Sequence, residues 1–381
     1  MFFKSLRIQV FQSKSGIIYN VLFAQKIQEL TVLFLALCFT FNKREIYMRK
    51  GIVVLLLLFF CVYDSVDASK SIASTVWGFY GHKRINRMAT FTLPPEMFPF
   101  FKRNIEYVTE HAVDPDKRRY AAEGEAPRHY IDIDHYIEHG EDPFEVVPKM
   151  WDEAVVKFTE DTLLAYGIVP WHIEVMIGRL TQAFREKDAH YILSMASDLG
   201  HYIGDAHVPL HTTENYNGQF TDQKGIHGFW ESRIPEMHAN DYDYFTGRAT
   251  YIENISDEVW DVVRGSHYAL DSVLGFEKDL TQEFATDEKY SYETRGATTV
   301  KVYSKDFTNE YNAMMGDMVE RRMRQSIIMV GSAWYTAWVK AGQPDLDELD
   351  QPVVSEEELQ RQKELELKFR DGKIKGREHA H

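Results

Sequence analysis

Cysteine is nearly absent from this chain of 381 residues. The two that occur, Cys38 and Cys61, both lie in an apolar N-terminal stretch, and residues 62–381 contain none. No disulfide can therefore staple that part of the chain, and no cysteine can bind a metal ion there. A zinc site in that part must be built from histidine nitrogens and carboxylate oxygens, which are also zinc ligands.

Positive charge is also in short supply. Lys and Arg together number 43 against 58 Asp and Glu, which gives a formal net charge of -15 at pH 7. Proteins that hold duplex DNA on a broad basic surface gain affinity by neutralising phosphates, so this balance argues against that class. A phosphate-ester substrate is not excluded, because a bound metal ion is itself the largest local positive charge in its site.

Motifs of several other enzyme classes are missing. The sequence has no G-x-S-x-G, no Walker-type glycine loop and no dinucleotide-binding glycine fingerprint. Hydrophobic residues make up 44% and aromatic residues 14% of the chain, which is enough for a sizeable core in one large domain or two.

Long apolar runs are confined to the N-terminus. Residues 48–68 combine a positively charged start, an apolar run over Ile52–Val62 and a small-residue cleavage pattern before Ser69. This combination is typical of a secretory signal peptide and too short for a membrane span. We therefore expect a secreted or periplasmic protein with a cleaved signal peptide. Residues 1–47 are then a possible upstream extension, and the alternative is one leader with a second apolar segment at 32–41.

Histidines and carboxylates recur at regular spacing in one short stretch. His201 and Asp205 lie four residues apart, and so do His227 and Glu231, with His211 between the two pairs. On a helix, residues four apart share one face, so each pair can hold one metal ion. A single pair arises by chance on solvated helices, but two pairs and a third histidine within 31 residues favour a metal site over structural histidines.

Helical periodicity is frequent after the signal peptide. Apolar residues at i, i+3, i+4 and i+7 spacing mark a central helix over 188–204, whose inner end carries His201 and Asp205. Further helical segments are expected at 85–91, 98–110, 147–166, 171–186, 240–300, 321–339 and 355–370. The last of these belongs to a charged C-terminal tail, 345–381, and is expected to be solvated.

Three more candidates stand upstream of the histidine-rich stretch. His82 lies at the start of an expected helix, His129 opens the acidic and aromatic run H-Y-I-D, and Asp116 lies in a turn-rich segment between them. Taken singly, each has an ordinary explanation. A histidine such as His82 is more often packed or capping, and Asp116 can form a surface ion pair with Arg119 that contributes little.

The order of these motifs is distinctive: W-G-x-x-G-H, an aspartate, H-Y-I-D, H-x-x-x-D-x-x-x-x-x-H and then H-x-x-x-E. It resembles the superfamily that joins the bacterial zinc-dependent phospholipases C and the fungal and plant type I single-strand-specific nucleases. The resemblance runs from Trp77 to about Ala341 and includes the helix at 321–339. It implies an all-α fold, with a single mostly helical phosphodiesterase domain over 77–344 built around a trinuclear zinc cleft.

The resemblance also implies which residues bind two or three zinc ions. One ion would be held by Asp116, His129, His201 and Asp205, a second by His211, His227 and Glu231, and a third by His82, Asp205 and the main-chain nitrogen and carbonyl of Trp77. Asp205 would therefore bridge two of the ions and hold the geometry of the cluster.

Two features of this chain depart from the family. In the family the tryptophan is the mature N-terminus and its free amine binds metal, whereas the best cleavage site here leaves Ser69, eight residues before Trp77. Either a second cut occurs or the third zinc ion loses a ligand. In addition, Asp114 and Asp116 compete for one ligand position. Asp116 is preferred because Arg119 then stands three residues after the ligand, as in the nucleases.

The implied activity is that of a zinc-dependent phosphoric ester hydrolase, in which a hydroxide that bridges two zinc ions attacks phosphorus. Arg119 would clamp a phosphate oxygen in a charge-assisted contact. Tyr130 takes the place of an aromatic residue that stacks a base in the nucleases, and Asp132 the place that reads a base edge. The alternative for Tyr130 is plain core packing.

The substrate is left open between two classes. Arg119 favours a nuclease or nucleotidase acting on single-stranded nucleic acid or nucleotides. Glu231 favours a phospholipase C acting on phospholipid headgroups, because the nucleases tend to have Asp at this position. A zinc-binding protein without catalysis is a third hypothesis. It is disfavoured because a storage or structural zinc site does not require an ordered set of ligands together with Arg119. No stable protein partner is indicated, and a monomer is expected.

Overall fold

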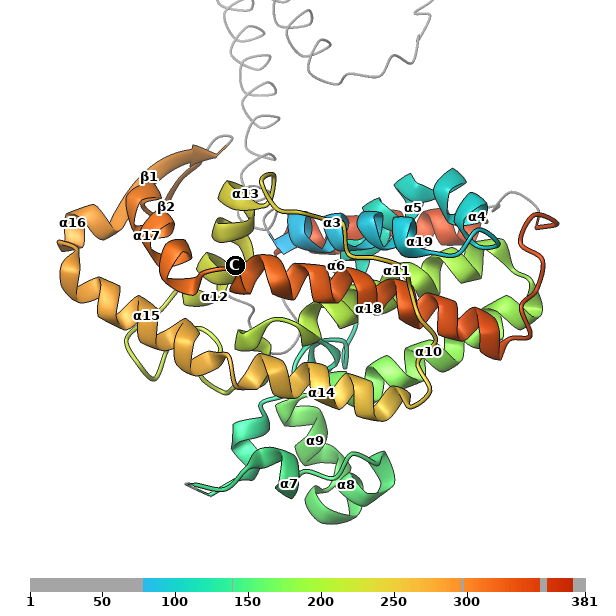
Figure 1. The fold of residues 1–381 in the computed structure, drawn as a ribbon, viewed down its shortest axis with the longest axis horizontal. Coiled ribbons are helices and arrows are strands. Elements are labelled where there is room, and N and C mark those ends of the chain that lie inside the picture. Colours follow the sequence, from blue (N-terminus) through green and yellow to red (C-terminus); the bar gives the residue numbers. More distant parts are fainter. Residues whose placement is uncertain (1–77, 139, 296–297, 350–354, 373–381) are drawn as a thin grey trace, which may run out of the picture. The chain divides into compact units, whose positions relative to one another are not determined.

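The computed structural model describes residues 78–138, 140–295, 298–349 and 355–372 (Figure 1). All of them belong to one contact unit, Lys70–His381. The expected signal peptide and upstream extension, Trp77 and the end of the tail lie outside the described residues. Among the described residues, no helix combines the length and the apolar character needed to cross a bilayer.

Helices make up most of the described chain, which confirms the all-α class. The α-helices are α3 (Gly78–Ala89), α4 (Phe98–Arg103), α5 (Ile105–Glu110), α6 (Asp114–Arg118), α7 (Pro143–Val146), α8 (Trp151–Phe158), α9 (Glu160–Tyr166), α10 (Val169–Glu186), α11 (Ala189–Ala206), α12 (Ile226–Gly228), α13 (Ile234–His238), α14 (Ile255–His267), α15 (Leu270–Glu283), α16 (Thr286–Lys289), α17 (Lys305–Met315), α18 (Met318–Lys340) and α19 (Glu356–Asp371). The short 3-10 turns are η2 (Thr90–Thr92), η3 (His111–Val113), η4 (Ala126–His129), η5 (Ile133–Tyr136) and η6 (Pro209–Thr212), and the π-helical turn is η7 (Phe229–Arg233). One antiparallel hairpin is formed by β1 (Tyr290–Arg295) and β2 (Thr298–Tyr303).

The central helix α11 forms where its apolar stripe predicts a helix. Asp188 caps its beginning, because the Asp188 side chain accepts a hydrogen bond from the backbone N–H three residues on. Ile192 and Leu199 are fully buried, and the helix packs against α10 and α18. His201 and Asp205 therefore lie in the last two turns of a helix that is enclosed by other helices.

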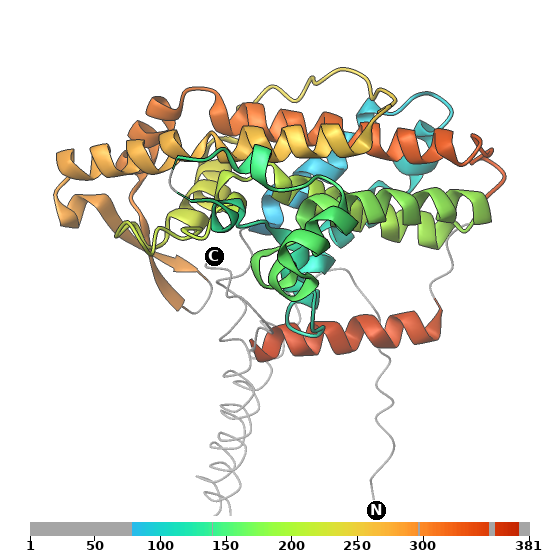
Figure 2. The same cartoon turned by 90° about the horizontal axis from the view of Figure 1, so that it is seen from below.

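The last predicted helix corresponds to α18, which packs against α3, α10 and α11 (Figure 2). Trp334 is fully buried on this helix and stacks on Phe101 of α4, with ring centroids 4.8 Å apart. Its indole Nε1 donates a hydrogen bond to the Ala196 carbonyl of α11 at 3.0 Å. One side chain thus joins α18 to both α4 and α11 and satisfies its own polar atom in the core.

Two predicted helices are interrupted by polar side chains. The helix expected at 98–110 divides at Asn104, whose side-chain amide donates to a carbonyl four residues back at 2.9 Å. The helix expected at 147–166 breaks at Thr159, which has a φ of 71° and whose hydroxyl caps the next helix, α9. In both places a local side-chain hydrogen bond competes with the helical ladder.

The expectation that 240–300 continues helical is wrong at both ends, because residues 240–254 form no helix and α14 begins only at Ile255. Helices α14, α15 and α16 occupy part of this segment, but the chain then enters the β1–β2 hairpin, in which Tyr290 pairs with Tyr303. The β2 sequence T-T-V-K-V-Y is rich in β-branched residues, which favour strands. Tyr303 stacks on Phe229 with ring centroids 3.9 Å apart, so the hairpin supports the π-helical turn η7.

Candidate metal centre

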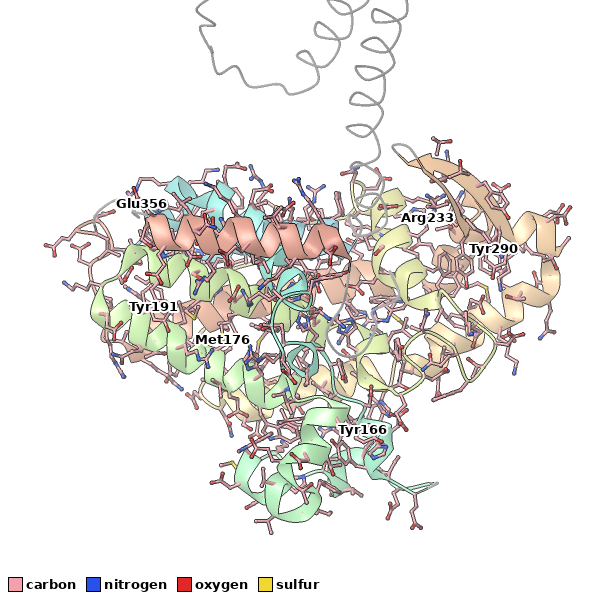
Figure 3. All side chains as sticks on the ribbon, turned by 180° about the vertical axis from the view of Figure 1, so that it is seen from behind. Tyr166, Met176, Tyr191, Arg233, Tyr290 and Glu356 are labelled. Atoms are coloured by element: carbon pink, nitrogen blue, oxygen red, sulfur yellow. The ribbon has the colours of Figure 1, made fainter. Side chains whose placement is uncertain are left out.

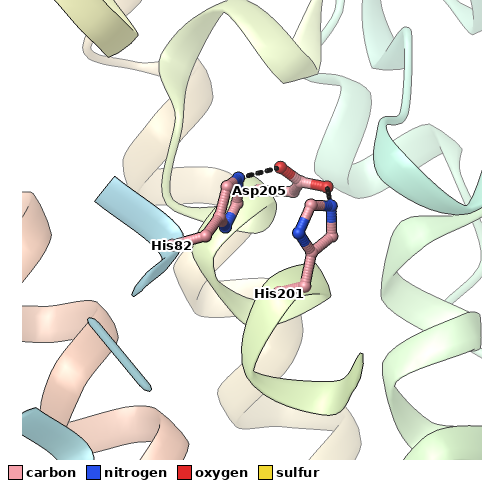
Figure 4. Close-up of side chains that lie close together, drawn as sticks. All are labelled: His82, His201 and Asp205. Atoms are coloured by element: carbon pink, nitrogen blue, oxygen red, sulfur yellow. Dashed lines mark ion pairs between the residues drawn. The ribbon is translucent and has the colours of Figure 1, made fainter. Parts of the chain in front are cut away.

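His82, His201 and Asp205 come together from two neighbouring helices (Figure 4). His201 and Asp205 lie four residues apart on α11, and His82 lies on α3. His82 Nε2 is 3.3 Å from Asp205 Oδ1, and His201 Nε2 is 3.2 Å from Asp205 Oδ2. Gly204 permits this close approach, because a Cβ at that position would lie 2.9 Å from His82 Nδ1. All three side chains are buried, with at most 4% of any residue exposed.

Asp116 and His129 join this group from short helical turns. Asp116 lies on α6, and His129 ends the 3-10 turn η4. His129 Nδ1 is 2.9 Å from Asp205 Oδ2 and 3.0 Å from His201 Nε2. Asp116 Oδ1 is 3.7 Å from His201 Nε2 and 3.8 Å from His129 Nδ1. One atom from each of Asp116, His129 and His201 can therefore face a single shared point.

His211, His227 and Glu231 form a third group beside the other two. His211 lies on the 3-10 turn η6, and Glu231 lies on the π-helical turn η7, a rare geometry that is frequent at functional sites. Glu231 Oε2 is 2.9 Å from His227 Nε2 and 3.6 Å from His211 Nε2. Glu231 Oε1 is 3.6 Å from His82 Nε2, so this carboxylate faces two groups at once.

Asp205 occupies the middle of the whole arrangement. Its Oδ2 faces His129 and His201, whereas its Oδ1 lies 3.3 Å from His82 Nε2 and 3.6 Å from His211 Nδ1. The two carboxylate oxygens thus point to different histidines. This geometry suits a carboxylate that connects two metal ions.

Backbone carbonyls fix the ring orientation of His211 and His227. His211 Nδ1 donates to the His129 carbonyl at 2.6 Å, and His227 Nδ1 donates to the Tyr216 carbonyl at 3.1 Å. Because a carbonyl oxygen only accepts, each Nδ1 carries a proton, and each ring turns its Nε2 toward Glu231 and toward the other histidine. The two Nε2 atoms lie 3.2 Å apart. Two ring nitrogens at this distance are stabilised by a shared cation, which can be a proton or a metal ion.

His201 follows the same pattern. Its Nδ1 donates to the Ala112 carbonyl at 2.8 Å, which leaves Nε2 free to face Asp116, His129 and Asp205. Hydrogen bonds from the far ring nitrogen commonly orient metal-binding histidines and select their tautomer. Three of the candidate ligands are therefore already held with Nε2 turned toward the centre.

Three buried carboxylates concentrate negative charge among these rings: Asp116, Asp205 and Glu231. Burial by itself raises the pKa of Asp205, but His201 and His211 overcome this effect and hold its pKa well below its usual range. Burial also opposes a charge on His82, yet its contacts with Asp205 and Glu231 raise the pKa of His82 to about 10. The centre therefore favours added positive charge, and the nitrogen and carboxylate donor set fits zinc.

The structure separates the two competing aspartates of α6. Asp114 turns away from the histidine groups, because its Oδ2 is 2.6 Å from His111 Nδ1 and its Oδ1 is 3.2 Å from Lys117 Nζ. Asp116 is 5% exposed and faces His201. Of the two, Asp116 is the one placed to share a metal ion with the histidines.

Arg119 lies beside the group of Asp116, His129 and His201 and is almost fully buried, at 2% exposure. Its Nη1 is 4.0 Å from Asp116 Oδ1. Burial lowers the pKa of Arg119, and the negative charges of Asp116 and Asp205 oppose that shift. A guanidinium cation is thus held at the edge of the candidate metal centre.

Tyr130 and Asp132, the residues expected to contact a base, are largely buried in this structure. They are 4% and 5% exposed. Tyr130 OH donates to the Ala165 carbonyl at 3.5 Å, and its ring packs against Gly167, where any Cβ would overlap Tyr130. The backbone is also fixed, because the Asp132 N–H donates to the Tyr166 carbonyl at 2.7 Å. These contacts draw both side chains into the protein interior.

Glu125 is a residue of the site that sequence reasoning missed. It is 1% exposed, and its Oε1 lies 3.7 Å from His129 Nε2. Tyr202 OH donates to Glu125, and Arg128 Nη1 lies 2.7 Å from its other oxygen. The signal was present in the sequence, because Glu125 and His129 have the same spacing of four as the recognised pairs.

Trp77, the remaining expected ligand, lies outside the described residues. The other expected metal ligands are brought together in the three groups above, from segments as far apart in sequence as α3 and η7.

Comparison with known proteins gives a family for this arrangement. The chain matches the family model described as S1/P1 nuclease over residues 77–343, which is more than half of its length. No curated protein matches it. Among solved structures it is similar to the crystal structure of Clostridium perfringens alpha-toxin from avian strain SWCP, with 10% sequence identity and a TM-score of 0.40. That match covers 72% of this chain and 66% of the toxin chain, so this chain spans just under two thirds of the toxin's length.

The family match begins at Trp77 and ends close to Ala341, so it covers the region of the resemblance seen in the motifs and confirms it. The match contains all of the candidate metal ligands. The chain belongs to the S1/P1 nuclease family.

Proposed function

We propose that this chain is an exported zinc-dependent phosphodiester hydrolase acting on single-stranded nucleic acid or on nucleotides. The observation that carries the metal is the close approach of His211 and His227, whose Nε2 atoms lie 3.2 Å apart beside Glu231. Membership of the S1/P1 nuclease family supports the hydrolysis of phosphoric esters as the reaction and nucleic acid as the substrate class.

The proposed centre holds two or three zinc ions. One ion is proposed to be bound by Asp116, His129, His201 and Asp205, and another by His211, His227 and Glu231. A third is proposed to be bound by His82 and Asp205, together with Trp77 if the amine of Trp77 is freed. When bound, the ions supply Lewis acidity and lower the pKa of water toward neutrality. The arrangement of Asp205, with one oxygen toward each side, supports its role as the bridging ligand.

The chain's own residues orient this chemistry. Carbonyl contacts hold the rings of His201, His211 and His227, so little reorganisation is needed when metal binds. Arg119, at 4.0 Å from Asp116, offers a guanidinium that can pair with a phosphate oxygen. These features support a site that binds a phosphate group and places it against the metal ions.

Single strands are proposed as the preferred form of the substrate. A single strand can turn a nucleotide into a buried centre, whereas a duplex must first unstack one at a cost of a few kcal/mol. The burial of Tyr130 and Asp132 means that base contacts by these two residues require a local movement of the 130–132 segment. The second candidate substrate is a phospholipid headgroup. Glu231 favours it, because the nucleases tend to have Asp at this position.

Export is proposed from the sequence pattern at 48–68. The positively charged start, the apolar run and the small residues before Ser69 support a signal peptide that is removed. A centre built without cysteine suits an oxidising compartment, because none of its ligands can be lost to disulfide formation.

Metal content and substrate choice test the proposal together. Purified protein is analysed for zinc, and its hydrolysis of single-stranded DNA, RNA, duplex DNA and phosphatidylcholine vesicles is compared. We expect two or three zinc ions per chain and faster cleavage of single strands than of duplex. His227→Ala should lose zinc and activity, whereas His135→Ala, outside the three groups, should keep both.

Three outcomes would contradict parts of the proposal. Less than one zinc ion per chain would remove the metal centre. Ready hydrolysis of phosphatidylcholine with no action on single-stranded DNA or RNA would favour the phospholipase function. Stoichiometric zinc without either activity would indicate a zinc-binding protein that is not a catalyst.

A further inference from the structure

Helix α19 lies beyond the region matched by the family. Most of its side chains are exposed, as its charged sequence predicts, but one face docks on the domain. In Figure 3 it runs from the labelled Glu356 across the side of the molecule that faces away in Figure 1. It lies against α6, and its most buried residue is Phe369, which is only 8% exposed in a helix of mostly charged residues. The Phe369 ring lies edge-on to Tyr120, with centroids 5.1 Å apart, and 5.8 Å from the ring of Phe79.

Phe369 completes a small apolar cluster that is separate from the two larger cores. Its other members are Phe79, Val113 and the partly buried Tyr120. Each of these partners stands close in sequence to a residue that faces the metal centre. Phe79 lies one helical turn before His82, Val113 follows the residue whose carbonyl holds His201, and Tyr120 directly follows Arg119.

Contacts along the remainder of α19 are weak. Between this helix and α10 and α11 lies a cavity of about 360 Å³, lined largely by polar side chains that include Arg118, Asp198 and Arg361. Lys117 Nζ is 4.0 Å from Glu366 Oε2, an exposed pair that contributes little. Leu367 points to solvent at 65% exposure. Docking of the helix therefore depends chiefly on the burial of Phe369.

From this geometry we infer that α19 is a strap whose Phe369 holds α3 against the segment that directly follows α6, and so positions His82 and Asp116 for metal binding. Phe369 is a positioning residue, because it contacts neither ligand and acts through Phe79 and Tyr120. The segments on both sides of Phe369 supply one ligand to each of two groups, so its loss should affect those groups and spare the His211, His227 and Glu231 group. This inference rests on the metal centre of the proposed function.

Metal affinity of the full-length purified protein tests the strap. Phe369→Ala is compared with wild type and with Leu367→Ala, a control that removes an exposed apolar side chain from the same helix. Zinc dissociation constants are measured by competition with a chromophoric chelator, and cobalt(II) absorption spectra report the ligand geometry. In Phe369→Ala we expect about a tenfold weaker constant for at least one ion, as for other residues that support metal ligands. We also expect a changed cobalt spectrum, and no change in Leu367→Ala.

Phe369→Leu provides the rescue, because leucine retains most of the apolar burial. It should recover most of the zinc affinity and the wild-type cobalt spectrum. If Phe369→Ala does not fold, Tyr120→Ala, which removes the ring on which Phe369 packs, takes its place in the comparison. Equal zinc constants and cobalt spectra in wild type and Phe369→Ala would overturn the strap and leave the proposed function standing. A wild-type protein that binds no zinc would overturn the proposed function and the strap together.

Discussion

Arg322 of α18 donates a hydrogen bond from Nε to the carbonyl oxygen of His207 at 2.9 Å. His207 stands two residues after Asp205 and four before His211, so this contact fixes the turn between two metal-facing segments. The Arg322 Nη2 also donates to Ser266 of α14. Burial lowers the pKa of Arg322 to about 10, so the guanidinium is still charged at neutral pH. One buried cation thus ties the turn to two long helices.

Replacing Arg322 by methionine should lower the free energy of unfolding by about 1.5–3 kcal/mol or more, because the His207 carbonyl loses a charged donor while buried. Urea unfolding measures the change. Arg321→Met is the matched control, since the Arg321 side chain is 48% exposed and should cost less than about 0.5 kcal/mol. Equal costs for the two variants would show that the buried contacts of Arg322 contribute nothing.

Asp205→Asn should abolish activity and reduce the zinc content. The substitution replaces one oxygen of the central carboxylate by an NH2 group, which does not bind a metal ion, and removes the negative charge. Asp114→Asn should keep zinc and activity, since Asp114 interacts with His111 and Lys117 outside the three groups. Zinc analysis and assays on single-stranded DNA compare the two. An inactive Asp114→Asn together with a nearly normal Asp116→Asn would show that the ligand on α6 is assigned to the wrong aspartate.

His172 should make stability fall as the pH is lowered. Burial and the nearby charge of Arg128 lower the pKa of His172 to about 3, from about 6.5 in the unfolded chain. Between these values only the unfolded state takes up the proton, so this stability is complete above pH 6.5 and is lost as the pH falls toward 3. The slope from this one proton is at most about 1.4 kcal/mol per pH unit.

His172→Phe tests this dependence, because phenylalanine can keep the edge-on contact with Tyr202, now at 4.6 Å between centroids. Urea unfolding in the presence of chelator, at pH 7.5 and 4.5, keeps zinc release out of the comparison. The variant should lose less stability than wild type over this interval. Identical losses would mean that His172 is protonated in the folded protein.

Lys289 and Glu277 form a buried ion pair, with Nζ and Oε1 2.6 Å apart and side-chain exposures of 8% and 1%. Lys289→Met should cost about 3–5 kcal/mol, because it leaves the Glu277 carboxylate uncompensated in the interior. The exposed pair Lys149–Asp257 has the same 2.6 Å separation and gives the control. Lys149→Met should cost less than about 1 kcal/mol in urea unfolding. Similar costs for both would show that burial does not decide the contribution of these pairs.

The mature N-terminus is expected to lack residues 1–68. N-terminal sequencing of the exported protein should find Ser69, or Trp77 if a second cut occurs. A start at Trp77 would free its amine for metal and should accompany a third zinc ion, whereas a start at Ser69 should leave that ion weakly held. Retention of Met1 in a membrane-bound form would refute the signal peptide.

Much of the candidate site could be predicted because its residues carry short-range signals. The pairs His201–Asp205 and His227–Glu231 follow the repeat of a helical turn, which survives even in the π-helical geometry of η7. The apolar stripe of α11 likewise predicts which face is buried. Each of these features depends on residues a few positions apart, so the sequence is sufficient to find them.

The features that escaped prediction depend on contacts distant in sequence or on local competition. Phe369 lies in a charged tail, and only the fold shows that its ring packs on Phe79. Asn104 ends a helix through a single side-chain hydrogen bond. Periodicity gives no warning of such events.

The candidate ligands are spread over a long stretch of chain, from His82 on α3 to Glu231 on η7, and no cysteine occurs anywhere between them. Metal ions bound there would act as cross-links that close long loops, as disulfides do in many exported proteins. Unlike a disulfide, such a cross-link depends on concentration, since a bound ligand stabilises the fold by RT ln(1 + [L]/Kd). The lifetime of the folded protein would then follow the free zinc of its surroundings, and a chelator would act on it as a reductant acts on a disulfide.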